Sequence, residues 1–265
     1  MKGRLSIEFV YQLFALLVAV IIVHAAYVSV IRPQAKADSA AIQAQIESNP
    51  DASPERSLWV IVRDYEQEVC FILMLWAMAL LALKASGVVR ERKLLNEDLI
   101  PVNAGESILP EDTREYARAI EALDEPEREY LFPRVLLAAL HRFRATRNVQ
   151  DVSDAVTNIC ESETDRLDSE LSMIRYIAWA IPSIGFIGTV RGIGEALGLA
   201  HKAVEGDISG VTAALGLAFN STFVALVLSI ILMFLLFQLQ LVQERLVMDT
   251  HNACDRRLLQ NLQSR

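Results

Sequence analysis

The hydrophobic residues of this chain are gathered into four long segments instead of being spread at the spacing of a soluble core. The segments cover Phe9–Ile31, Val69–Leu83 with an extension to Val89, Ile174–Leu199 and Val211–Leu241. A transmembrane helix needs about 20 predominantly apolar residues to cross a bilayer. Three segments reach this length, and the second reaches it at Val89 because Lys84 can place its charge at the membrane surface. The pattern predicts four transmembrane helices.

Between these segments the periodicity is helical, and no β pattern is present. We expect helices at Gln34–Glu47, Glu111–Leu123, Tyr130–Arg147 and Val149–Arg175, with a turn at Asn49–Pro54 and a loop at Pro101–Pro110. The predicted organisation is a first span in 1–31, a periplasmic loop in 32–68, a second span in 69–89, a cytoplasmic helical region in 90–172, the third and fourth spans in 173–241 and a cytoplasmic C-terminal helix in 242–265. The fold class is an all-α membrane protein with four transmembrane helices and long helical cytoplasmic extensions.

Basic residues predict the orientation of these spans. Lys2 and Arg4 precede the first segment, Arg90 and Arg92 follow the second, and Arg256 follows the fourth. Cytoplasmic flanks carry the excess of Lys and Arg, so both termini are expected in the cytoplasm. The first segment is longer than the ~7–15 apolar residues of a signal peptide, which favours an uncleaved span.

Charge and composition exclude several classes of function. The net charge is −8 and no basic stripe is present, which argues against nucleic-acid binding. Cys70, Cys160 and Cys254 lie far apart, in neither a disulfide framework nor a metal spacing, and are expected to be small buried residues. Neither a nucleophile–base arrangement nor a phosphate-binding glycine loop occurs, so we expect no enzyme, cofactor or metal site. His24, the titratable residue deep in the first span, is either a satisfied packing residue or part of a proton relay.

The third and fourth spans carry small, weakly polar residues at helical spacing. Gly185, Gly188 and Gly192 lie on one face of the third span beside Thr189, and the fourth span has a similar face: Ala218, Thr222, Ala225 and Ser229, flanked by Asn220 and Ser221. Such faces let two helices approach closely in lipid, with hydroxyls bonded to backbone carbonyls. They could equally line a narrow polar path for an ion, because a hydroxyl both donates and accepts a hydrogen bond. The two faces carry no carboxylate, so an ion path would need one from another subunit.

Three further residues of the third span stand out. Pro182 removes a backbone donor and should kink or loosen the helix. Arg191 and Glu195 are four residues apart, as in an intrahelical ion pair. Charges at this depth are costly unless they are paired or face a wet cavity, so the two residues are either a satisfied pair or the entrance of an ion path.

The stretch from Gly185 to Ile193, Gly-Phe-Ile-Gly-Thr-Val-Arg-Gly-Ile, resembles the third-span signature of the MotA/TolQ/ExbB proton-channel family. Ser221-Thr222-Phe223-Val224-Ala225 falls where that family places its second pore threonine, and the resemblance covers about residues 150–250. The Gly-Thr-Val core is closer to the TolQ and ExbB branch, whereas four spans resemble the flagellar architecture. Arg191 replaces the family's usual aromatic or aliphatic residue.

The resemblance implies a homopentamer in the bacterial inner membrane around the single spans of two copies of a MotB/TolR/ExbD-like partner, which supplies an essential aspartate. Ion flow at that interface would drive a rotary motor, with Thr189 and Thr222 as pore threonines and Pro182 as the family's kink. The alternative is a non-conducting scaffold of an envelope complex. The choice between H+ and Na+, and the load (flagellar, gliding, outer-membrane energisation, transport or phage defence), stay open.

Overall fold

The computed structural model describes residues 2–48, 57–97, 99–100 and 107–263, and 87% of it is helical. Four of its helical stretches are long and apolar enough to cross a membrane: Phe9–Gln45, Tyr65–Leu95, Val149–Gly198 and Ser209–Asn261. The chain is therefore an all-α membrane protein, and no strand occurs among the residues described. Two compact units are formed, unit 1 by residues 1–81 and 173–236, and unit 2 by residues 82–172 and 237–265.

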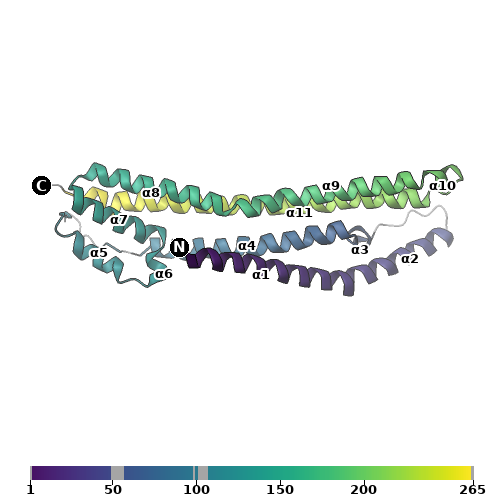
Figure 1. Cartoon of the computed structure of the whole chain (residues 1–265), viewed down its shortest axis with the longest axis horizontal. Coiled ribbons are helices and arrows are strands. Elements are labelled where there is room, and N and C mark those ends of the chain that lie inside the picture. The colour runs from purple at the N-terminus through teal and green to yellow at the C-terminus, as the bar shows by residue number, and fades with distance from the viewer. Residues whose placement is uncertain (1, 49–56, 98, 101–106, 264–265) are drawn as a thin grey trace. The chain divides into compact units, whose positions relative to one another are not determined.

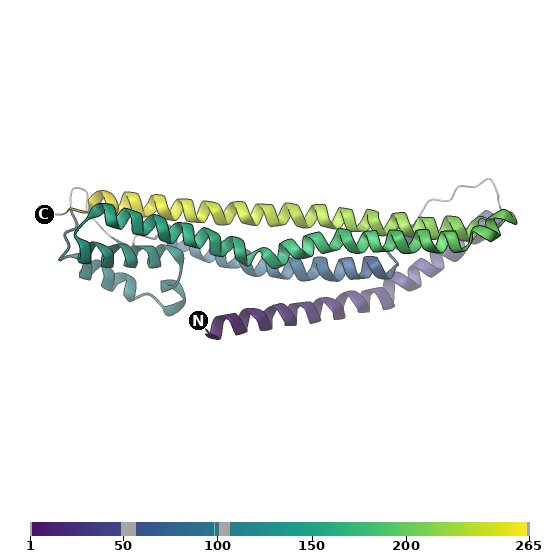
Figure 2. The same ribbon diagram turned by 45° about the horizontal axis from the view of Figure 1, so that its top comes forward.

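Unit 1 contains the apolar helices. α1 (Lys2–Ala26) continues through a π-helical turn, η1 (Tyr27–Ile31), into α2 (Arg32–Ser48), and α3 (Leu58–Ile61) is a single turn. α9 (Ser172–Gly198) is followed by α10 (Ala200–Val204), while α4 (Tyr65–Leu95) and α11 (Ser209–Arg257) contribute residues to both units. α9 and α11 lie side by side along unit 1 (Figure 1, and from a second direction Figure 2).

Polar atoms connect the helices of unit 1 at a few points. The Trp76 indole of α4 donates to the Gln12 carbonyl of α1 at 3.0 Å, and the Tyr11 hydroxyl donates to the Ala79 carbonyl at 3.3 Å. Large apolar side chains are exposed on this unit: Phe14, Phe186 and Ile230 are each more than 60% exposed. Large exposed apolar surfaces are unfavourable in water and suit contact with lipid or another subunit.

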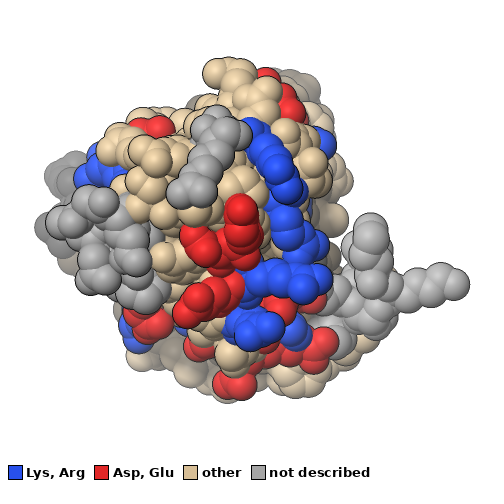
Figure 3. Space-filling model, turned by 90° about the vertical axis from the view of Figure 1, so that its left-hand side faces the viewer, with Lys and Arg blue, Asp and Glu red and all other residues tan. Residues whose placement is uncertain are grey.

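Unit 2 is built from α5 (Thr113–Glu121), α6 (Glu125–Arg128), α7 (Leu131–Thr146), α8 (Val149–Glu170) and η2 (Leu259–Asn261), together with the ends of α4 and α11. Leu136, Leu140 and Phe143 of α7 are fully buried, and Val152 and Val156 of α8 join them in the core. One isolated parallel bridge joins Ile108 to Leu262. On the face shown in Figure 3, basic and acidic side chains lie directly beside one another.

The predicted helices are confirmed with small changes at their ends. Asp124-Glu125-Pro126 was expected to separate two helices, and the separating segment itself forms the short α6. A one-residue turn at Leu171 divides the predicted continuous helix into α8 and α9. The predicted turn at Asn49–Pro54 and residues 101–106 of the predicted loop lie outside the described residues.

The second apolar helix begins four residues before the predicted second span. α4 starts at Tyr65, not at Val69, and includes Glu66 and Glu68. The Asp64 backbone N–H donates to the Gln67 side chain at 2.9 Å, one of the two hydrogen bonds of a capping box. Both glutamates are ion-paired, which makes their place in an apolar helix tolerable.

Candidate ion path between two membrane helices

The two threonines predicted from sequence meet between α9 and α11. The Thr189 and Thr222 hydroxyls are hydrogen-bonded to each other, and both side chains are half-buried. Thr189 is also 3.0 Å from the Ala218 carbonyl, and Thr222 donates to the Gly185 carbonyl at 3.1 Å. Each helix therefore offers a carbonyl to the threonine of the other, and all the acceptors near the two hydroxyl protons belong to the protein.

The predicted glycines bring α9 and α11 to this distance. A methyl group added to Gly185 would lie 2.4 Å from Ala225 Cβ, and one added to Gly192 would lie 2.8 Å from the Ala214 carbonyl oxygen. At Gly188 the same methyl group would meet Ser221, 2.7 Å from its hydroxyl oxygen. No side chain larger than hydrogen fits at these positions without separating the helices. The packing interpretation of the small faces is thus observed directly.

The other polar residues of α11 take different positions. Ser221 is fully buried and its hydroxyl donates to the Leu217 carbonyl at 3.0 Å. Asn220 is half-buried and enters none of the contacts between the threonines. Of the two, only Ser221 lies against α9, where it faces Gly188.

Pro182 has a partner on α11 that the sequence did not reveal. α9 continues through the proline, which has no N–H to donate to the carbonyl of Ala178, four residues earlier. The Ser229 hydroxyl of α11 donates to that carbonyl at 3.1 Å instead. A missing helical hydrogen bond is thus replaced by a bond between helices, and the Cys70 thiol approaches the Ile181 carbonyl at 3.6 Å nearby.

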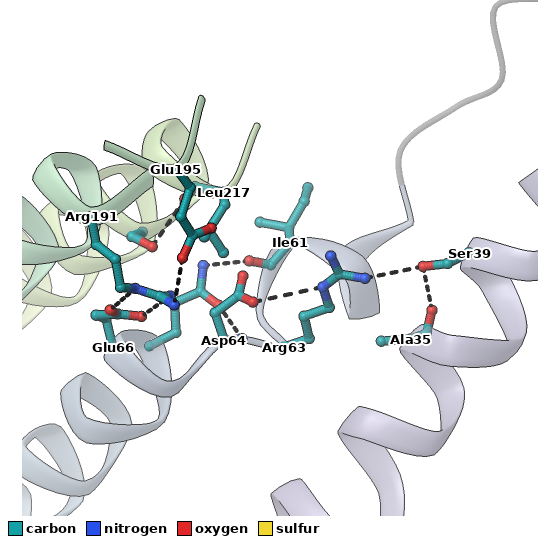
Figure 4. Close-up of polar contacts among 11 residues, drawn as sticks. Ala35, Ser39, Ile61, Arg63, Asp64, Glu66, Arg191, Glu195 and Leu217 are labelled. Atoms are coloured by element: carbon teal, nitrogen blue, oxygen red, sulfur yellow. Dashed lines mark hydrogen bonds and ion pairs between the residues drawn. The ribbon is translucent and has the colours of Figure 1, made fainter. Parts of the chain in front are cut away.

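Arg191 has a stronger partner than the predicted one. The pair with Glu195 is present at 3.3 Å, but both oxygens of Glu66 from α4 lie closer, at 2.7 Å from Nε and 2.8 Å from Nη2 (Figure 4). Such a bidentate pair is the strongest arrangement that arginine makes with a carboxylate. Sequence reasoning missed Glu66 because its partner lies 125 residues away along the chain.

Asp64 is the titratable group at the start of this network. Burial raises the pKa of Asp64 to about 6, against the opposing effect of Arg63 and Arg191. Its carboxylate lies 3.7 Å from Arg63 Nε. Asp64 therefore changes charge within a range of pH that a cell envelope can experience.

His24 has a carboxylate partner in this structure. Its Nδ1 lies 2.6 Å from one oxygen of Glu68, and Arg32 donates to the other oxygen at 2.5 Å. The Glu68 side chain is 7% exposed, so this carboxylate is buried with both oxygens paired. The three cysteines are buried and free, as predicted.

These features define an all-helical, multi-pass membrane protein in which two hydroxyl groups and an ion-paired network lie at closely packed helices. Residues 127–252 match the model of the MotA/TolQ/ExbB proton channel family. This part of the chain is therefore similar to a family of membrane proton channels. The matched range includes Thr189 and Thr222, whereas α1 to α4 precede it. Neither the curated proteins nor the solved structures give a match.

Proposed function

We propose that the chain is the multi-pass subunit of a proton-driven motor. It forms a homopentamer in the bacterial inner membrane, with both termini in the cytoplasm, around the single spans of two copies of an aspartate-bearing partner. Proton flow at the interface between chain and partner is converted into mechanical work. Support comes from the family match over α9 and α11 and from the hydroxyl pair that these helices hold together.

The hydrogen bonding of Thr189 and Thr222 is the observation that carries this proposal. Both hydroxyl protons can be donated to acceptors within the α9–α11 contact, which leaves oxygen lone pairs free to accept. A protonated aspartate has a donor that fits such an acceptor, whereas an ionised aspartate has none. The pair therefore favours the neutral form of the partner's carboxyl group, the form that carries a proton across.

The hydrogen bonding of the two hydroxyls also favours H+ over Na+. A dehydrated sodium ion needs several oxygen ligands at once, and one of the two nearby carbonyls, that of Gly185 or of Ala218, is already engaged by a threonine proton. Two hydroxyl oxygens with one partner carboxylate make a poor sodium site. We therefore expect the rate of ion-driven work to follow the pH gradient and to be unaffected by replacing Na+ with K+.

The test compares Thr222→Val with Thr222→Ser in vesicles from cells that produce the full chain with its single-span partner, sought first among the neighbouring genes. Proton flux is read from an internal pH-sensitive dye after a pH gradient is imposed. The valine variant should lose flux and the serine variant should keep it. Thr212→Val is the matched control, because the Thr212 hydroxyl bonds to carbonyls of its own segment, those of Ile208 and Ser209, and not to another helix.

The alternative is a non-conducting scaffold, and one observation favours it: every hydroxyl of the α9–α11 contact already has a protein acceptor. Under this alternative, vesicles with the wild-type chain would show no more proton flux than vesicles without the chain. Thr222→Val would then weaken only the packing of the helices, to the same extent in every assay. Flux that is lost in the valine variant while the oligomer stays intact supports the motor.

A further inference from the structure

Glu66 and Glu68 begin the same helix, yet they point to different helices of unit 1. Residues two apart on an α-helix face away from one another. Glu68 is paired with His24 and Arg32 of the α1–α2 helix, and Glu66 with Arg191 of α9. Two carboxylates with similar sequence surroundings therefore occupy different sites, and only Glu66 lies on the side of the threonine pair.

Glu66 reaches the contact between α9 and α11 through the space left by Gly188. A methyl group added to Gly188 would lie 3.2 Å from Glu66 Cγ and 2.7 Å from Ser221 Oγ. Gly188 and Ser221 each immediately precede one of the two threonines. The Glu66 side chain thus lies beside a residue that is next to Thr189 in the chain, in a helix contact that the sequence alone left without any carboxylate of this chain.

Arg191 fixes the position of this carboxylate. Its Nε and Nη2 hold the two Glu66 oxygens, while Nη1 is 3.3 Å from Glu195, so the guanidinium is held by two carboxylates at once. The Glu66 side chain is 12% exposed. Both oxygens of this partly covered carboxylate are therefore held by one guanidinium group.

Polar groups also lie between this pair and α2. Figure 4 shows Ser39, Arg63 and Asp64 in succession toward Glu66. Arg63 donates to the Ser39 hydroxyl at 3.3 Å and lies 3.7 Å from Asp64. The Arg63, Arg191 and Glu195 side chains are 42%, 39% and 49% exposed, whereas the Glu66 side chain is 12% exposed. Exposed charged side chains thus lie close to the more covered carboxylate, as they would at an entrance.

We propose that Glu66 is a further ion-path residue, a carboxylate that α4 places beside Gly188, next to Thr189 in the chain, and that Arg191 is the residue that positions it. This inference rests on the proposed function. A fixed negative charge next to the two hydroxyls lowers the free energy of a cation that arrives there in a region of low dielectric. Glu66 lies outside the residues that match the family model, so α4 would contribute this role in addition to the helices that match.

The test uses the matched pair of carboxylates in the vesicle assay described above. Glu66→Gln keeps the shape of the side chain and removes its charge, and flux should fall about tenfold, the equivalent of about 1.4 kcal/mol in the barrier. Glu66→Asp should restore part of the flux, and Arg191→Lys, which keeps the charge but loses the bidentate geometry, should be intermediate. Glu68→Gln is the control: it disturbs a buried pair, so it should reduce stability while the flux per assembled oligomer stays within twofold of wild type.

Two comparisons separate the failure of this inference from failure of the proposed function. If Thr222→Val abolishes flux while Glu66→Gln behaves like Glu68→Gln, Glu66 is not on the path although the chain conducts. If neither Thr222→Val nor Glu66→Gln changes flux, the proposed function fails as well.

A second measurement does not require flux. Cysteine introduced by Glu66→Cys in the full chain should react with a water-soluble, positively charged methanethiosulfonate faster than cysteine introduced by Glu68→Cys. The three native cysteines are buried and give a low background. If the two introduced cysteines react with the reagent at the same rate, the proposal of a polar entrance at Glu66 is wrong.

Discussion

Replacing Gly185 by alanine tests how closely α9 and α11 are packed. The added methyl group would lie 2.4 Å from Ala225 Cβ, so the two helices must separate by 1.0 Å to reach the 3.4 Å at which ordinary contact begins. That movement would lengthen the 3.1 Å hydrogen bond from Thr222 to the Gly185 carbonyl to about 4 Å, beyond the range of a hydrogen bond. One substitution should therefore disturb both the packing and the hydroxyl pair.

Three contributions set the magnitude. Overpacking a well-packed contact costs about 1–3 kcal/mol, and the lost hydrogen bond costs about 1 kcal/mol more. Alanine in place of glycine inside a helix returns about 1 kcal/mol. The Gly185→Ala chain should thus be less stable by about 1–3 kcal/mol, the range that overpacking alone gives.

Gly194→Ala is the matched control, because no atom lies within 4 Å of the methyl group that it would add. This variant should keep or slightly raise the stability through helix propensity alone. The assay is the loss of helical circular dichroism as SDS is titrated into the purified full chain in mixed micelles. Equal stability of the two alanine variants would refute the close contact on which the threonine geometry depends.

Three further predictions concern other parts of the chain. The raised pKa of Asp64 means that the folded state binds more protons than the unfolded state between about pH 4 and 6. The stability of the fold should therefore decrease as the pH rises through that window. Asp64→Asn should remove this pH dependence in SDS titrations at different pH. Arg147 ends α7 with φ of 54°, so Arg147→Gly should stabilise the chain by roughly 1 kcal/mol in the same titration; a loss of stability would contradict a left-handed cap. Glu163 is 3% exposed and paired with Arg134 and Arg166, and Glu163→Ala should therefore cost about 3–5 kcal/mol of unfolding free energy, an expectation that a near-neutral effect would rule out.

Local patterns were sufficient to predict the helices. Apolar runs, helical periodicity and small-residue faces are properties of neighbouring residues, and α7, α8, α9 and α11 follow them closely. The contact of Thr189 with Thr222 could also be expected, since two small faces on consecutive spans pack best against each other. Pairing between distant residues was not predictable in this way. Ser229 gave no sign that it would replace the hydrogen bond missing at Pro182.

The acidic start of α4 is the clearest case of this limit. Three acids within five residues favour a loop when the local sequence alone is considered, because unpaired charges do not fit an apolar helix. Two of them are neutralised by arginines from other helices, Arg32 and Arg191, that lie 36 and 125 residues away in the chain. Only the fold brings these partners together, so neither ion pair could be predicted from the local sequence.

The π-helical turn between α1 and α2 serves this pairing. His24 and Arg32 are eight residues apart, and in a regular α-helix their side chains would be displaced around the axis by about 80°. In the structure the Arg32 N–H donates to the Tyr27 carbonyl, five residues earlier, so the wider turn accommodates an extra residue and reduces that displacement. Both side chains then reach Glu68, one at each oxygen. An irregular turn and an acid inside an apolar helix are each unfavourable alone. The pairing of Glu68 with His24 and Arg32 explains both features together.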